Sequence, residues 1–276
     1  MPRARVVLVH GLRTSATMWR RQCAMLARHD LDVVAIDLPG HGTRLGEPFS
    51  FDVAMRIIDE GLNPPGALPV PRLLVGLSLG GYLAMEFAAR HPDRLDGLVA
   101  ASCGTRPRGP ALAGYRRLAA LIGRLPDRGR TLHDLMTRLF LSPGAADDVL
   151  AGGVALDVMA PVLEAAASMD PEAALARVEV PVWLVNGRFD HFRFDERRML
   201  RAARDARLVV VPGATHLVSL VRPDDFAAVV AGAVAELERR AAVAARHRRI
   251  ARESGSAHDG TASDALSTSR IGVAGE

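Results

Sequence analysis

The chain has 276 residues, 49% of them hydrophobic, which is enough for one domain with a sizeable core and an appendage. The formal net charge is only +4, and all 35 basic residues are arginine, so chemistry that needs a lysine, such as a Schiff base, is excluded. The two cysteines, Cys23 and Cys103, lie far apart without a C-x-x-C pattern, which argues against a disulfide framework or a zinc site.

Short apolar runs alternate with longer helical patterns along most of the chain. Six strands are predicted, at residues 6–9, 32–36, 73–77, 95–101, 180–185 and 207–211. Helices are predicted between and after them, at residues 17–28, 51–61, 79–90, 195–204 and 222–240. This pattern is typical of an α/β fold, in which helices cover both faces of a mostly parallel sheet. Ligands bind such sheets at the carboxyl ends of the strands.

One long segment, residues 104–179, interrupts this alternation. It contains helical patterns at residues 112–125, 132–141 and 154–167 but no convincing strand. We therefore expect a core formed by residues 1–103 and 180–240, into which residues 104–179 are inserted as a helical lid. Residues 241–276 are expected to be a basic helix end followed, from about residue 252, by a disordered tail rich in Ser, Gly, Ala and Thr.

The motif Gly76-Leu77-Ser78-Leu79-Gly80 lies between the third predicted strand and the helix after it. A serine between glycines at a strand-to-helix turn is typical of a nucleophile elbow, in which the serine has strained backbone angles. Both glycines are needed there because a side chain would collide with the neighbouring backbone. The same residues also suit a plain glycine-rich packing turn, so the functional interpretation needs partners elsewhere in the chain.

A serine hydroxyl becomes a good nucleophile only beside a base, which a third group must orient. An elbow serine predicts the chain order serine, acid, histidine. Asp190 follows the fifth strand in a glycine-containing turn, and His216 follows the sixth strand. Both therefore lie at the same edge of the sheet as Ser78.

Three other residues compete for these two roles. Asp195 is better explained as a helix N-cap, and Asp170 lies in the expected lid. His191 is a neighbour of Asp190 and could contact it, but it precedes a helix and is not expected to face the elbow. We therefore assign the acid to Asp190 and the base to His216.

Acyl transfer also needs two N–H donors for the oxyanion of the tetrahedral intermediate. One expected donor is the N–H of Leu79, directly after the serine. The other should come from the loop that follows the first strand and begins His10-Gly11-Leu12-Arg13. Gly11 allows that loop to turn sharply, which leaves the N–H of Leu12 as the candidate.

Five separated motifs now stand in order along the chain. They are His10-Gly11, Asp37-Leu38-Pro39-Gly40-His41-Gly42, the elbow, Asp190 and His216. Together they resemble proteins of the α/β-hydrolase fold over roughly residues 6–237, and more narrowly the lid-bearing serine esterase, lactonase and haloperoxidase-like branch. Serine at the elbow, where related branches have aspartate, counts against a haloalkane dehalogenase or an epoxide hydrolase.

The resemblance implies roles for particular residues. Ser78, Asp190 and His216 would form a catalytic triad, with the N–H groups of Leu12 and Leu79 as the oxyanion hole. The turn at residues 37–42 would be structural, so that its histidine is not catalytic. Two departures leave these roles untouched: only six strands can be counted, without the family's first antiparallel strands, and His191-Phe192 follows the acid where proline is common.

The function predicted from these residues is that of a serine hydrolase that cleaves a small ester, lactone or thioester, without cofactor or metal. The same residues would also suit a carbon–carbon bond hydrolase, a lyase or a perhydrolase, and the fold can serve as a non-catalytic small-molecule receptor. Arg13, Met136 and Phe140 are candidate substrate contacts, although surface or packing roles explain them equally well.

The arginines of the expected lid allow two interpretations, a basic mouth for an anionic substrate or simply solvated helix faces. No nucleic-acid module, signal peptide or apolar run long enough to cross a bilayer is recognisable. We expect a cytoplasmic protein that acts on a small molecule as a monomer or homodimer.

Overall fold

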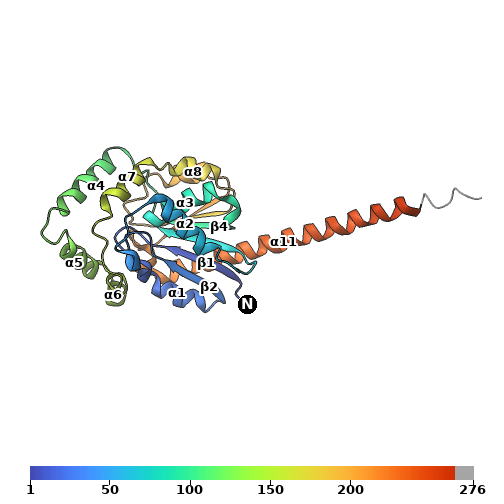
Figure 1. Ribbon diagram of the computed structural model, residues 1–276, viewed down its shortest axis with the longest axis horizontal. Helices are drawn as coiled ribbons and strands as arrows, with labels where there is room; N and C mark the ends of the chain where they lie inside the picture. Colours follow the sequence, from blue (N-terminus) through green and yellow to red (C-terminus); the bar gives the residue numbers. More distant parts are fainter. Residues whose placement is uncertain (265–276) are drawn as a thin grey trace, which may run out of the picture. The chain divides into compact units, whose positions relative to one another are not determined.

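The computed structural model describes the backbone of residues 1–264, and their side chains except at 110, 111, 248 and 250–264. It confirms the predicted α/β fold, a sheet with helices around it (Figure 1). The sheet has six parallel strands in the order β2-β1-β3-β4-β5-β6. The strands are β1 (Ala4–Val9), β2 (Leu31–Ile36), β3 (Arg72–Leu77), β4 (Gly97–Ala101), β5 (Val182–Gly187) and β6 (Ala206–Val211). Because all six run in the same direction, the loops that follow them gather at one edge of the sheet.

Alternate residues of the inner strands are buried on opposite faces of the sheet. In β1, Val7 and Val9 belong to the core on one face, whereas Val6 and Leu8 are fully buried on the other. The first face is covered by a layer of helices in successive contact, α2 (Phe51–Leu62), α3 (Leu79–Arg90), α8 (Pro171–Arg177) and α9 (Glu196–Ala202). The second is covered by α1 (Arg20–Ala27) and the beginning of α11 (Pro223–Asp264).

The segment between β4 and β5 contains only helices, as the sequence predicts. They are α4 (Gly109–Ile122), α5 (Arg130–Phe140), α6 (Pro143–Ala151), α7 (Met159–Ser168) and α8. The helix expected at residues 154–167 begins only at Met159, and α6 and α8 were not predicted. Both missed helices begin with proline after a residue suited to an N-cap, at Ser142-Pro143 and Asp170-Pro171, which is a readable start signal.

Four short elements lie in the loops of the sheet. They are η1 (Ala16–Trp19), η2 (Gly42–Arg44), η3 (Pro92–Arg94) and α10 (Val218–Val221). Trp19, at the end of η1, is fully buried and stacks on Phe226 of α11, with the ring centroids 5.8 Å apart. This contact ties the loop after β1 to the second face of the sheet.

The chain divides into two compact units, Met1–Ala235 and Glu236–Glu276. In the second unit α11 continues to Asp264, beyond the point near residue 252 where a disordered tail was expected, and Glu236 accepts hydrogen bonds from Arg239 and Arg240. The rest of that expected tail, residues 265–276, lies outside the described residues. Among the described helices, none has an apolar stretch that would span a bilayer.

The turn from β3 into α3 determines where the sheet presents Ser78. This residue has φ 56° and ψ −114°, a conformation that residues with a side chain rarely adopt. A Cβ on Gly76 would collide with the carbonyl of Gly80, and a Cβ on Gly80 would collide with the carbonyl of Val9 in β1. On the other side, the N–H of Ser78 donates to the carbonyl of Ala101 in β4 at 2.8 Å. The turn is therefore held between the two strands that flank β3.

We expect Gly80→Ala to destabilise the fold by about 3 kcal/mol. The new methyl group would collide with backbone carbonyls, which cannot move aside as a side chain could. The matched control is Gly232→Ala in α11, where the added methyl group would have no atom within 4 Å apart from the neighbouring residues and backbone of its own helix. That variant should be unchanged or more stable by up to about 1 kcal/mol, because alanine favours the helix. Urea unfolding followed by circular dichroism measures both, and equal effects would contradict this account of the turn.

Candidate active site

The structure brings Ser78, His216 and Asp190 together at the carboxyl edge of the sheet. Nε2 of His216 lies 3.0 Å from Oγ of Ser78, and Nδ1 lies 3.0 Å from Oδ1 of Asp190. These residues follow β3, β6 and β5, so the parallel topology brings together positions as much as 138 residues apart. Since Asp190 can only accept at physiological pH, Nδ1 of the imidazole carries a proton and Nε2 is free to accept one from the serine.

Asp190 is buried and kept ionised by its neighbours. Burial alone would raise the pKa of its carboxyl, but the hydrogen bond and charge of His216 and the N–H of Phe192, which donates to Oδ1 at 2.8 Å, make the net shift downward. Oδ2 of Asp190 and the hydroxyl of Ser102 are both buried, and neither has a hydrogen-bond partner among the described residues. Ser102 directly follows β4, so it reaches the same edge by the same topology.

The two expected oxyanion donors lie beside the serine. A Cβ built on Gly11 would lie 3.6 Å from Cβ of Ser78, which shows how closely the loop after β1 approaches the elbow. Leu12 and Leu79 both line the cavity into which Ser78 opens. No acceptor for the N–H of Leu12 is found among the described residues, so this donor is available to a ligand.

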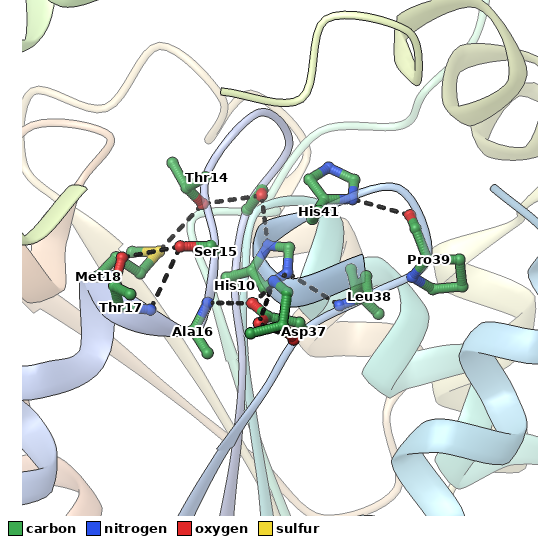
Figure 2. A network of polar contacts seen from close by, with 12 residues as sticks. His10, Thr14, Ser15, Ala16, Thr17, Met18, Asp37, Leu38, Pro39 and His41 are labelled. Carbon is green, nitrogen blue, oxygen red and sulfur yellow. Dashed lines mark hydrogen bonds and ion pairs between the residues drawn. The ribbon is translucent and has the colours of Figure 1, made fainter. Parts of the chain in front are cut away.

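His10 connects this loop to the loop after β2. Its ring is fully buried, Nε2 accepts the N–H of Leu38 at 3.0 Å, and Nδ1 lies 2.8 Å from the carbonyl of Gly11 (Figure 2). An N–H can only donate, so Nε2 must be unprotonated and Nδ1 must carry the proton. Burial and the nearby His41 lower the pKa of His10 to about 3, so the ring is neutral at physiological pH.

The hydrogen bonds to the Gly11 carbonyl orient the neighbouring donor. Besides His10, the hydroxyl of Thr14 donates to this carbonyl at 2.9 Å (Figure 2). A peptide group is planar, so a carbonyl held on one edge fixes the direction of the N–H of Leu12 on the opposite edge. Bonds that polarise the carbonyl also strengthen the N–H as a donor. His10 and Thr14 thus position the N–H of Leu12.

The turn at residues 37–42 holds the loop after β1 through hydrogen bonds to its backbone. Asp37 accepts from the N–H of Ala16 at 2.7 Å and from the N–H and hydroxyl of Thr43 at 2.9 Å and 2.8 Å. His41 is fully buried, with Nδ1 3.0 Å from the carbonyl of Pro39 and Nε2 accepting the N–H of Arg13 at 3.4 Å. His41 therefore has both nitrogens engaged in holding the backbone, as expected for a structural turn.

The cavity beside Ser78 has a volume of about 280 Å³ and mostly apolar walls. The sheet edge contributes Leu77, Leu79 and Leu217, and the inserted helices contribute Leu112, Tyr115, Val162, Leu163 and Ala166. The only charged side chain that lines it in the described residues is that of Arg106, whose Nε lies 3.4 Å from Glu172 and 3.5 Å from Asp195. The walls therefore favour an apolar group rather than an anion.

The three predicted substrate contacts do not line this cavity. Met136 and Phe140 lie on α5 and are 38% and 71% exposed. Arg13 has φ 65°, and its Nη2 donates to the carbonyl of Gly129 at 3.2 Å, at the start of α5. Arg13 therefore connects the loop after β1 to the inserted helices.

Several cavity residues were not singled out from the sequence. His191, which was not expected to face the elbow, lines the cavity with its ring centroid 5.2 Å from that of His216. The ring of Phe192 lies 4.9 Å from His216, and Tyr82 and Tyr115 complete the aromatic part of the wall. His191 and Phe192 could have been found from their place directly after Asp190. The N–H of Phe192 donates to that carboxylate, which keeps the turn tight and both side chains near the site. Among the described residues no cluster suited to hold a metal ion is found.

The neutral state of His10 should make the protein less stable in mild acid. The unfolded chain protonates this imidazole near its ordinary pKa of 6.5, whereas the folded protein does so only near 3, so stability is lost as the pH falls from about 6.5 towards 3. His10→Asn removes this group, and the slope of unfolding free energy against pH should fall by up to about 1.4 kcal/mol per pH unit between pH 4 and 6. Urea unfolding at a series of pH values measures it, and parallel slopes for the two proteins would contradict the assignment.

Comparison with known proteins gives a consistent result. The alpha/beta hydrolase family matches residues 6–229. The pimeloyl-[acyl-carrier protein] methyl ester esterase of Neisseria meningitidis serogroup C is 28% identical over 82% of this chain and 91% of its own length. Lipase LipV of Mycobacterium tuberculosis is 33% identical over 79% and 74%. A thermophilic esterase from Thermogutta terrifontis superposes with a TM-score of 0.68 at 25% identity, covering 86% of this chain and 91% of that one. The chain belongs to the alpha/beta hydrolase family.

Proposed function

We propose that this protein is a serine hydrolase that cleaves carboxylic esters through an acyl-enzyme on Ser78. The observation that carries the proposal is the line of hydrogen bonds from the hydroxyl of Ser78 through both ring nitrogens of His216 to Asp190, beside an apolar cavity. The activities named for two similar proteins, a methyl ester esterase and a lipase, are both ester hydrolyses and agree with the enzyme class predicted from the sequence.

In the first half-reaction, Oγ of Ser78 attacks the ester carbonyl carbon while Nε2 of His216 takes the hydroxyl proton. Asp190 accepts from Nδ1–H throughout, which keeps the imidazole in the tautomer that can take this proton and stabilises the imidazolium that forms. The tetrahedral intermediate then breaks the bond to the alcohol oxygen. The alcohol leaves with the proton from His216, and the acyl group stays on Ser78.

In the second half-reaction, water attacks the acyl carbon and gives a proton to Nε2 of His216. Collapse of this intermediate releases the acid and returns the proton to Oγ of Ser78. In both intermediates the carbonyl oxygen carries the negative charge, for which Leu12 and Leu79 would supply N–H donors. The bonds that fix the Gly11 carbonyl support this role, because they orient the donor before any substrate arrives.

We further propose that α4 to α8 act as a lid over the cavity, since α4 and α7 contribute several of its walls.

The enzyme would work in the cytoplasm, which its two unpaired cysteines, Cys23 and Cys103, support. Its state as a monomer or homodimer stays a prediction.

Ser78→Ala should lower kcat/KM for a short-chain p-nitrophenyl ester by about 10⁴-fold or more, because it removes the nucleophile without changing the buried core. Ser168→Ala is the matched control, since this exposed hydroxyl only donates to the carbonyl of Ala165, and it should keep full activity. Thermal unfolding of both variants checks the fold. An active Ser78→Ala enzyme would refute the proposed nucleophile.

The apolar cavity predicts a preference for longer acyl groups. Each methylene buried in it should raise kcat/KM by about fourfold until the cavity is full, as measured with p-nitrophenyl esters from acetate upward. Ala166→Leu narrows one wall and should move the optimum to a shorter chain without lowering the activity on acetate. A flat profile in both proteins would mean that the acyl group does not enter this cavity.

A further inference from the structure

Helix α5 presents an apolar face that is not covered by the described part of the chain. Apolar residues recur at the spacing of one helix face, at Leu132, Leu135, Met136, Leu139 and Phe140. Such a stripe normally faces the core, yet none of the residues of α5 is buried, and these five are 37% to 71% exposed. The helix is nevertheless fixed in place, because it packs against α6 and Arg13 binds its first turn.

The exposed apolar residues continue along α4 and the turn between the two helices. Leu118, Leu121 and Leu125 are each at least 43% exposed. Together with the five residues of α5 they form what we call the α4–α5 apolar surface. Most other large apolar side chains of the described residues are buried, so this concentration points to a binding surface.

The same stretch is strongly basic. Residues 115–140 contain six arginines and two aspartates. Arg128 and Arg138 form ion pairs with Asp157 and Asp147, whereas Arg116, Arg117 and Arg124 are exposed, and no ion-pair partner for them is found in the described range. Cationic and apolar side chains thus alternate along two helices, a pattern typical of a helix that lies at the surface of an anionic membrane.

Charge decides between the possible occupants of this surface. A second copy of the chain would bring two arginine-rich stretches together, and their repulsion would oppose burial of the leucines. An acidic protein would satisfy the arginines but would have to provide a groove for side chains as exposed as Leu139 and Phe140. An anionic lipid surface satisfies both, with arginines at the phosphates and apolar side chains among the acyl chains.

We propose that the α4–α5 apolar surface docks on an anionic lipid bilayer. The surface is continuous with the cavity, because α4 also contributes Leu112 and Tyr115 to the cavity wall. Docking would therefore bring the α4 wall of the cavity close to the lipid, so that an ester dissolved there would have a short path to Ser78. This last step rests on the proposed esterase function, whereas docking itself does not.

The test is sedimentation of the full chain with vesicles of phosphatidylglycerol and phosphatidylcholine, compared with vesicles of phosphatidylcholine alone. The wild type should bind the anionic vesicles more tightly, and added salt should weaken this binding. The double variant Leu139→Ser and Phe140→Ser should weaken binding to anionic vesicles by about tenfold or more. Its control, Leu45→Ser and Leu68→Ser, changes two leucines elsewhere that are 46% and 44% exposed, and it should bind like the wild type.

A second pair of variants tests the arginines. Arg116→Gln with Arg117→Gln should weaken binding to anionic vesicles by about tenfold. The control is Arg239→Gln with Arg240→Gln on α11, which removes the same charge from the other basic helix and should have little effect. If only the α11 variant loses binding, the proposed surface is wrong.

Three further outcomes would overturn the proposal. They are no binding to anionic vesicles, binding that both α4–α5 variants retain, and a dimer in ultracentrifugation that the Leu139→Ser and Phe140→Ser variant abolishes. Saturable binding to an acidic protein with no vesicle binding would assign the surface to a protein partner instead. Ser78→Ala separates the two proposals, because it should still bind vesicles whether or not the wild type hydrolyses esters.

Discussion

The sharp turn at Ser78 is the constraint on which the rest of the site depends. The chain passes from β3 into α3 through a conformation that costs free energy, and it stays there because β1 and β4 enclose it. β1 approaches so closely that position 80 must be glycine, and the carbonyl of Ala101 in β4 binds the N–H of Ser78. The central place of β3 in the parallel sheet therefore gives the serine a fixed position, against which the loops after the other strands are arranged.

The polar groups around this turn have two different roles, proton exchange with the serine and positioning of the backbone. His216 and Asp190 reach the cavity edge and can exchange a proton with the serine. His10, His41 and Asp37 lie behind the loop after β1, where each is engaged by backbone groups. A preorganised donor stabilises developing charge without having to reorient during the reaction, so the buried network has a catalytic consequence although it does not contact a substrate. The same network makes the protein less stable in acid, because buried His10 is protonated more readily in the unfolded chain.

Much of the architecture could be predicted from the sequence, for reasons that particular residues illustrate. The strands are continuous apolar runs, and parallel strands put their carboxyl ends at one edge, so the meeting of Ser78, Asp190 and His216 follows from topology. The spacing of apolar residues predicts a helix, but it does not show whether the apolar side of that helix faces the cavity or the solvent. Met136 and Phe140 were expected at the cavity for this reason, but α5 directs them outward. His191 was misjudged because a one-residue difference in a short turn decides which way a side chain points.

Covalent labelling tests the central claim most directly, since it asks which atom of the protein is nucleophilic. The full chain is treated with a fluorophosphonate, digested and mapped by mass spectrometry, beside a His216→Ala variant. The account predicts a single adduct on Ser78 in the wild type. At the same reagent concentration and time it predicts no adduct in the variant, because the hydroxyl loses its base. An unlabelled wild type, an adduct on another residue, or equal labelling of Ser78 without His216 would contradict it.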